Sequence, residues 1–212
     1  MVSLVANQII MGQAEPIPRR YTIAEYQALE ERSEIRHQYY KGEVFAMAGG
    51  TLNHSSLILR CATQLMAATE SRGCRVFAES VQLMVANGEY FTYPDVMVTC
   101  HPADVEAARV VQHPVLLIEV LSDSTAEHDR LWKLFRYQNL PSLRHYLLVS
   151  QQYQGIEWYR RTESGEWTQS VQVAPNGQID LPELGCFLLV SAIYGSLKIP
   201  LVSDNKPWGI AS

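Results

Sequence analysis

Hydrophobic and polar residues recur with two different periods along the chain, and these periods predict alternating helices and strands. The longest helical pattern spans residues 51–72, and Gly73 follows it where a C-terminal cap is expected. Its apolar positions recur at steps of three and four residues: Leu57, Ile58, Cys61, Leu65 and Ala68. A shorter helix is predicted after Thr22, because Glu25 three residues later completes a capping box.

Runs with a period of two, or with continuous apolar character, predict the strands. YYKGEVFAMA reads as a hairpin about Lys41 and Gly42, and CRVFAESVQLMV reads as one strand closed by the turn signal Asn87-Gly88. Further strands are predicted in three segments: TYPDVMVTC, HPVLLIEVLS and LRHYLLVS. Residues 101–113 read as a connection with one helical turn.

A second long helix is predicted to start at Ser124, where Glu127 completes another capping box, and to end at Pro141. Its apolar face is expected to consist of Leu131, Leu134 and Phe135.

The order from residue 51 is helix, strand, strand, strand, helix, strand, which predicts a mixed sheet with helices on its faces. We therefore expect an α/β (α+β) fold with an αβββαβ core. Short alternating runs from residue 151 to about 189 predict a small antiparallel C-terminal extension. The expected organisation is an N-terminal arm (1–18), one domain (19–200) and a C-terminal tail (201–212).

Composition narrows the class of protein. The chain has 212 residues, 47% of them hydrophobic, and a net charge of −5, which allows a sizeable core and excludes bulk disorder. No apolar run is long enough to span a bilayer and no signal peptide is recognisable, so we expect a cytoplasmic protein without membrane contact. The four scattered cysteines (Cys61, Cys74, Cys100, Cys186) are expected to be buried thiols of a reduced protein.

Two carboxylates stand in apolar strands. Glu119 lies inside VLLIEVL, and a buried carboxylate needs a counter-charge such as arginine, lysine or a metal ion. A simple buried ion pair or a position at a strand end would also explain it. Asp95 follows Pro94 at the start of another apolar strand, although Asp after Pro is also a common turn element. On adjacent strands the two would supply the oxygen ligands that suit Mg²⁺ or Mn²⁺.

Other candidates are weaker. Asp129, Lys133 and Tyr137 share one face of the second long helix, and an ordinary solvated face is the simplest interpretation of them. Glu43 reads as a solvent-facing strand residue. His54 reads equally well as a helix-start hydrogen-bonding group or as part of a site, and Glu79 can face a cleft or water.

Four phrases together resemble the PD-(D/E)XK nuclease superfamily, and within it the Uma-type family of restriction endonucleases. They are YYKGEVFAMAGGTLNHSSLI, YPDVMVTC, PVLLIEVLSDSTAEHDRLWKLFRY and HYLLVS, and the similarity extends from about Arg19 to about Leu197. The resemblance implies a restriction-endonuclease-like fold and hydrolysis of phosphodiester bonds with a divalent metal ion, Mg²⁺ or Mn²⁺.

The resemblance also implies roles for individual residues. Asp95 and Glu119 would bind the metal ion. The lysine expected two residues after the glutamate is replaced by Leu121, and Lys133 in the following helix would take its place as a catalytic residue that positions water or phosphate. Neighbours of the site would be Glu43, His54, Asp129 and Tyr137.

The expected partners follow from this reading. The substrate would be a nucleic acid, DNA, and a homodimer is expected because two-fold symmetry suits cleavage of both strands. Arg130 and Arg136 would contact flanking phosphates. The acidic pI of about 5.7 and the missing in-strand lysine favour one alternative, a catalytically silent nucleic-acid-binding or assembly module that keeps the fold. A hydrolase of small phosphoesters is a further alternative.

Overall fold

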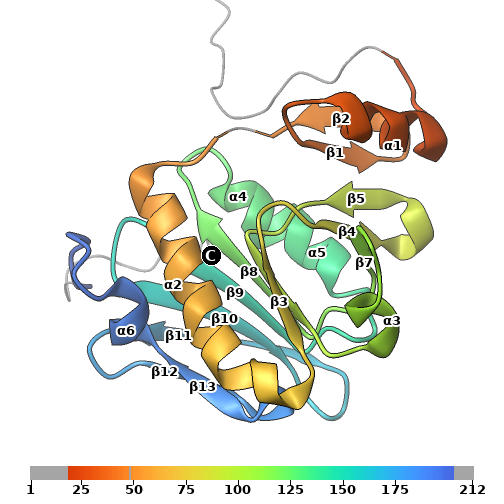
Figure 1. Cartoon of the computed structure of the whole chain (residues 1–212). Helices are drawn as coiled ribbons and strands as arrows, with labels where there is room; N and C mark the ends of the chain where they lie inside the picture. The colour runs from red at the N-terminus through yellow and green to blue at the C-terminus, as the bar shows by residue number, and fades with distance from the viewer. Residues whose placement is uncertain (1–18, 48, 203–212) are drawn as a thin grey trace, which may run out of the picture.

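The computed structural model describes residues 19–47 and 49–202, and these form two larger β-sheets and a two-stranded one (Figure 1). The six-stranded main sheet has the order β11-β10-β9-β8-β6-β3. Its strands are β3 (Arg75–Ala78), β6 (Val96–Thr99), β8 (Leu116–Leu121), β9 (His145–Ser150), β10 (Gly155–Arg161) and β11 (Trp167–Val173). Only β8 and β9 pair in parallel, so the sheet is mixed, as predicted.

Side chains of β8 alternate between two cores, one on each face of the main sheet. Leu116, Ile118 and Val120 pack in the core that contains helix α2 (Leu52–Thr69). Leu117 and Leu121 pack on the other face, together with Tyr137. This alternation follows from the strand pleat, and it directs Glu119 toward the second face.

Helix α2 crosses one face of the main sheet, and the helical segment from residue 126 to 137 covers the other (Figure 1). Thr51 caps α2 by accepting a hydrogen bond from the His54 N–H, and Gly73 ends its 3₁₀ extension (Glu70–Arg72) in the left-handed conformation. In chain order, α2, β3, β6, β8, the second helical segment and β9 form the predicted αβββαβ core.

The second sheet has the order β2-β1-β5-β4-β7, and helix α1 (Ile23–Arg32) packs on it. Its strands are β1 (His37–Tyr40), β2 (Glu43–Ala46), β4 (Gln82–Val85), β5 (Tyr90–Thr92) and β7 (Val110–Val111). The predicted capping box is present, because Thr22 N–H donates to Glu25 Oε2 (2.9 Å) while the Thr22 side chain accepts from Glu25 N–H.

The prediction of single strands over CRVFAESVQLMV and TYPDVMVTC is wrong, because each segment contributes to both sheets. Glu79, with a φ of 56°, ends β3 and turns the chain toward β4. Tyr93, Pro94 and Asp95 likewise separate β5 from β6. The N–H of Glu79 donates to the Asp95 carbonyl (3.0 Å), so the two crossings between sheets lie side by side.

The second long helix also differs from its prediction. It consists of α4 (Ala126–His128), a π-helical turn (Asp129–Lys133) and α5 (Leu134–Tyr137). The expected capping box does not form: Thr125 is the N-cap, and its N–H is bound by Ser122 Oγ (3.2 Å).

The expected apolar face of this helix is largely wrong as well. Leu131 and Phe135 are 65% and 63% exposed, whereas Asp129, Lys133 and Tyr137 are buried. The polar side chains face inward because the main sheet presents Glu119 beneath them.

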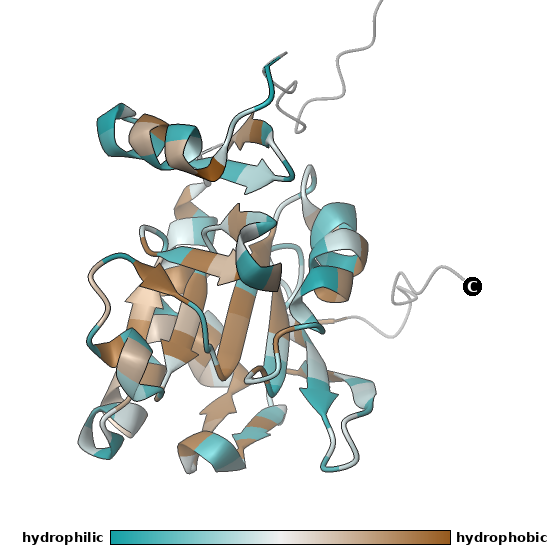
Figure 2. Cartoon of the chain, turned by 90° about the vertical axis from the view of Figure 1, so that its right-hand side faces the viewer, coloured by the Kyte–Doolittle hydropathy of each residue, from teal (hydrophilic) through white to brown (hydrophobic). Residues whose placement is uncertain are grey.

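The C-terminal extension is antiparallel, as predicted. Strands β10 and β11 extend the main sheet, whereas β12 (Gln178–Leu181) and β13 (Cys186–Leu189) pair with each other. The remaining short elements are α3 (Pro102–Val105), α6 (Val190–Tyr194) and the 3₁₀ turns Ala86–Gly88 and Pro182–Leu184. Figure 2 shows the apolar strands at the centre of the molecule. The predicted arm (1–18) and residues 203–212 of the tail lie outside the described residues.

No helix in the described ranges is long and apolar enough to cross a membrane.

The cysteine prediction is wrong for two of the four residues. Cys74 and Cys100 form a disulfide: β3 and β6 pair so that Arg75 faces Thr99, and Cys74 just before β3 therefore lies beside Cys100 just after β6. Cys61 is a buried free thiol and Cys186 a half-buried one.

We expect this disulfide to stabilise the fold, since it constrains an unfolded loop closed across 26 residues. Cys74→Ser should lower the free energy of unfolding by about 2–4 kcal/mol in urea titrations without reductant. Cys186→Ser is the control and should unfold like wild type. Equal stability of Cys74→Ser and unreduced wild type would contradict the prediction.

Asp104 organises the connection between β6 and β8. The carboxylate is buried and accepts the N–H groups of Gln112 (3.0 Å) and His113 (2.7 Å) and the hydroxyl of Thr99 (2.9 Å). Burial alone would raise the pKa of Asp104, but these hydrogen bonds outweigh it and hold the pKa below its usual value. The ionised carboxylate therefore stabilises the folded state.

The lowered pKa of Asp104 sets a pH dependence. The ionised Asp104 carboxylate contributes its full stabilisation of the folded state above the unfolded-state pKa of about 3.9. This stabilisation is lost as the pH falls through the lower pKa of the folded state. Asp104→Asn should cost about 1–3 kcal/mol at pH 7, and this difference from wild type should shrink toward pH 3. Urea unfolding over this pH range, with the exposed Asp180→Asn as control, measures it. A difference independent of pH would refute the role of the ionised form.

Candidate active site

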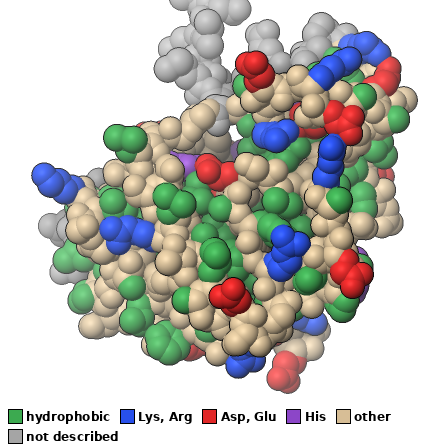
Figure 3. Space-filling model, viewed as in Figure 1, with side chains coloured by type: hydrophobic (Ala, Val, Ile, Leu, Met, Phe, Trp, Pro, Cys, Tyr) green, Lys and Arg blue, Asp and Glu red, His purple; other side chains and the backbone are tan. Residues whose placement is uncertain are grey.

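A cavity of about 710 Å³ lies where the two larger sheets meet. In Figure 3, histidine lies beside an acidic side chain at a hollow beneath the upper part of the molecule. The residues that line the cavity come from β1, β2, β5, the start of α2, the end of β8, the second helical segment, and the positions just before β6 and just after β9. They include Gln38, Tyr40, Glu43, Phe45, Met47, His54, Tyr90, Asp95, Glu119, His128, Asp129, Trp132, Lys133 and Gln151.

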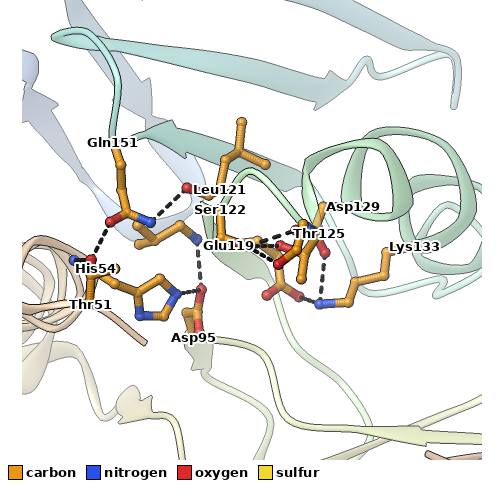
Figure 4. A network of polar contacts seen from close by, with 12 residues as sticks. Thr51, His54, Asp95, Glu119, Leu121, Ser122, Thr125, Asp129, Lys133 and Gln151 are labelled. Carbon is orange, nitrogen blue, oxygen red and sulfur yellow. Dashed lines mark hydrogen bonds and ion pairs between the residues drawn. The ribbon is translucent and has the colours of Figure 1, made fainter. Parts of the chain in front are cut away.

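Asp95 is fixed to the neighbouring strand by a backbone hydrogen bond. Because Val96 of β6 pairs with Ile118 of β8, Asp95 lies beside the next residues of β8. The Asp95 Oδ2 atom accepts the N–H of Val120 at 2.7 Å and lies 3.3 Å from Nε2 of His54 (Figure 4). Asp95 and Glu119 therefore open into the same cavity from adjacent strands, as the sequence predicts.

Glu119 is 3% exposed and is held from the helical side. Its Oε1 atom accepts the hydroxyl of Tyr137 at 2.9 Å and lies 3.0 Å from Nζ of Lys133. Burial raises the pKa of Glu119, and the Lys133 ammonium opposes that shift.

Lys133 is also buried and bridges two acids. Its Nζ atom lies 2.9 Å from Oδ1 of Asp129 and 3.0 Å from Glu119 (Figure 4). Burial alone would lower the pKa of Lys133, but the two carboxylates raise it well above its usual value, so the ammonium stays charged. The π-helical turn that begins at Asp129 and ends at Lys133 carries both residues on its inner side.

His54 connects the start of α2 to this centre. Burial lowers its pKa, but the contact with Asp95 and the negative charges of Glu79 and Glu119 together outweigh burial and raise the pKa of His54. A Cβ atom at Gly50 would lie 2.6 Å from His54 Nδ1, so only glycine leaves room for the ring. Gln151 ties this corner to the sheet by donating to the Leu121 carbonyl (2.8 Å) and accepting from the Thr51 hydroxyl (2.6 Å).

The donor set fits a hard divalent cation. Three carboxylates, Asp95, Glu119 and Asp129, outnumber the single ammonium of Lys133, and a cation would balance this excess of negative charge. Oδ1 of Asp95 and Oε2 of Glu119 accept no hydrogen bond from the described part of the chain. Two carboxylates and several waters suit Mg²⁺ or Mn²⁺. In residues 19–47 and 49–202, no three histidine, cysteine or acidic side chains converge as a full protein cage would require.

The structure brings some predicted residues together and separates others. Glu43 lines the cavity from the opposite wall, with Arg20 3.8 Å away, whereas Glu79 is exposed outside the lining. Arg130, which the sequence predicts to contact flanking phosphates, forms an ion pair with Glu157 (2.6 Å) and is half-buried.

Arg136 also has protein partners: its guanidinium donates to the Tyr40 hydroxyl and lies over the Tyr40 and Trp132 rings. Sequence reasoning missed Phe45, Tyr90, Trp132 and Gln151 as cavity residues. For Phe45, the alternation of side chains along β1 and β2 could have shown that it faces away from α1. The positions of Tyr90, Trp132 and Gln151 in the cavity depend on how the two sheets meet, which the sequence does not show.

The profile of the Uma2 family, described as "Putative restriction endonuclease", matches residues 23–189 of the chain. The chain belongs to the Uma2 family. This agrees with the resemblance found in the sequence, and the matched range contains Asp95, Glu119 and Lys133.

Two relatives from Synechocystis sp. (strain ATCC 27184 / PCC 6803 / Kazusa) are similar to this Uma2 chain over most of its length. The "Uncharacterized protein slr1290" is 33% identical over 189 residues, covering 89% of this chain and 98% of the relative. The "Uncharacterized protein sll1609" is 30% identical over 161 residues, covering 75% and 91%.

A solved structure supports the fold of this Uma2 chain. It is titled a "putative nuclease belonging to DUF820" from Anabaena variabilis ATCC 29413. The two structures superpose with a TM-score of 0.67 at 18% identity, over 82% of this chain and 97% of the other. At this identity the similarity establishes the shared fold alone.

The buried cluster predicts a large cost for removing its one cation. Lys133→Met leaves Glu119 and Asp129 buried without a counter-charge, so we expect a loss of about 3–5 kcal/mol in the free energy of unfolding. Urea denaturation without divalent metal measures it, with the exposed Lys198→Met as control. A loss no larger than that of the control would show that the ammonium does not balance these acids.

Proposed function

We propose that this protein is a metal-dependent endonuclease that hydrolyses phosphodiester bonds in DNA. Membership of the Uma2 family supports a nuclease. The observation that carries the assignment of residues is the buried contact between Lys133 and Glu119, in a cavity that also contains Asp95.

In this proposal Asp95 and Glu119 hold Mg²⁺ or Mn²⁺. When bound, such an ion lowers the pKa of a coordinated water and stabilises negative charge on the phosphate. Val120 N–H and His54 orient the Asp95 carboxylate. Tyr137 and Lys133 orient Glu119.

Lys133 acts as the cation that positions the attacking water or the phosphate. Its ammonium is charged and fixed between Glu119 and Asp129, so it needs little reorganisation when charge develops. It takes the place of the lysine that the superfamily carries two residues after the glutamate. Here that position is Leu121, which packs in the core beneath the helix.

The proposal includes a DNA substrate, action in the cytoplasm and a homodimer. Two-fold symmetry would present two such cavities to the two strands of a target. The oligomeric state is measurable by sedimentation and is independent of the roles of the residues.

Nicking of supercoiled plasmid in Mg²⁺, and separately in Mn²⁺, tests the activity. Asp95→Asn and Glu119→Gln should each lower the cleavage rate by at least about 100-fold, because each removes a ligand charge while keeping the side-chain shape. Lys133→Ala should lower it similarly, and is assayed only after circular dichroism shows it folded. The exposed Glu70→Gln is the matched control and should cleave like wild type.

Metal binding separates a nuclease from the alternatives. Mg²⁺ or Mn²⁺ should raise the melting temperature of wild type and not of Glu119→Gln. An uncut plasmid together with no metal effect would reject the nuclease in favour of a silent binding or assembly module. Metal-dependent hydrolysis of nucleotides without cleavage of plasmid or oligonucleotides would favour a small-phosphoester hydrolase.

A further inference from the structure

The β1–β2 hairpin has two different faces. Tyr39 and Val44 point to one side, where they are buried against Tyr26 of α1. Strand alternation sends Phe45 and its cross-strand partner Gln38 to the other side, which forms a wall of the candidate active-site cavity.

Phe45 packs in no hydrophobic core of the described residues. It is half-buried and lines the cavity, yet it belongs to none of the three hydrophobic cores and has no aromatic or cationic ring partner in the described ranges. Trp132, in contrast, lies between His128 (ring centroids 4.9 Å apart) and Arg136 (5.2 Å from the ring centroid). Tyr40 and Tyr90 both lie against Trp132 as well, so among the described lining residues Phe45 is the aromatic ring left free to stack on a ligand.

Polar groups flank this ring on the same wall. Gln38 is the cross-strand partner of Phe45, and its amide oxygen accepts the Tyr90 hydroxyl (3.3 Å), so the amide nitrogen is the group it offers to a ligand. The Glu43 carboxylate lies two residues before Phe45 on the same face. An amide and a carboxylate beside a ring can bond the edge of a nucleobase stacked on that ring.

The charge of the cavity argues for a base rather than a phosphate backbone on this wall. Among the described lining residues Lys133 is the only lysine or arginine, and it is bound to two carboxylates at the other wall. A backbone-binding groove would be lined with cations. Aromatic and amide groups here suit an uncharged planar base.

We propose that the wall formed by Gln38, Glu43 and Phe45 is a subsite for an unpaired nucleobase, so that DNA binds this wall only where its two strands are separated. This deepens the proposed nuclease function and rests on it, since the base would enter beside the scissile phosphate. A base within a duplex is stacked on both faces, so it reaches a ring inside a cavity only after leaving the stack.

Binding of a single strand that carries one 2-aminopurine tests the subsite without cleavage. The fluorescence of this base changes when it leaves its neighbouring bases and stacks on a protein ring, so wild type should change it in EDTA or in Ca²⁺, with the strand shown intact by electrophoresis. Phe45→Ala should weaken binding about tenfold. Phe45→Tyr should bind like wild type, and Phe45→Leu, which keeps the apolar bulk without a ring, should resemble Phe45→Ala.

The controls use features outside the cavity. Phe135→Ala removes an exposed ring from α5 that does not line the cavity, and it should leave binding unchanged. The same oligonucleotide annealed to its complement should bind at least about tenfold more weakly than the single strand. Equal binding by Phe45→Ala and wild type, wild-type binding by Phe45→Leu, or equal affinity for duplex would each overturn the subsite.

The two proposals fail separately. Plasmid or duplex cleavage that Phe45→Ala leaves unchanged would keep the nuclease and reject the subsite. A fluorescence change that depends on Phe45, in a protein that cuts neither single-stranded nor duplex DNA, would keep the base-binding wall and reject the nuclease.

Discussion

The buried triad of Glu119, Lys133 and Asp129 is the constraint that the arrangement of the site depends on. A carboxylate in the middle of a strand buried on both faces must find a counter-charge, and the helix that follows β8 supplies it. To do so, this helix turns a charged side toward the sheet and leaves Leu131 and Phe135 in solvent. The π-helical turn contains the two helical members of this triad, Asp129 at its start and Lys133 at its end.

The fold was largely predictable from the sequence, because its core elements have clear periodicity. The αβββαβ order, the N-cap of α1 and the antiparallel C-terminal strands follow from local patterns. The split at Glu79 was not predictable, since a run of strand-forming residues gives no sign that its two halves join different sheets. The disulfide depends on the pairing of β3 with β6, which cysteine spacing does not encode.

The sequence predicted the wall of the site that contains Asp95 and Glu119 better than the wall formed by the β1–β2 hairpin. Asp95 and Glu119 were visible as charges in apolar strands, and their meeting follows from the pairing of β6 with β8. The position of Lys133 beside Glu119 depends on the orientation of a helix whose apolar residues point the other way. The opposite wall depends on how the second sheet meets the first, and no local pattern specifies this contact.

The ammonium beside Glu119 comes from Lys133 in the helix, not from the strand. The strand position two residues after Glu119 therefore holds no charged side chain, and Leu121 packs there in the core. The spacing between carboxylate and lysine is then set by a loop and a helical turn, which can change length more easily than a strand register. A sequence search that requires a lysine two residues after the glutamate in the strand would therefore pass over this chain, although an ammonium does lie beside that glutamate.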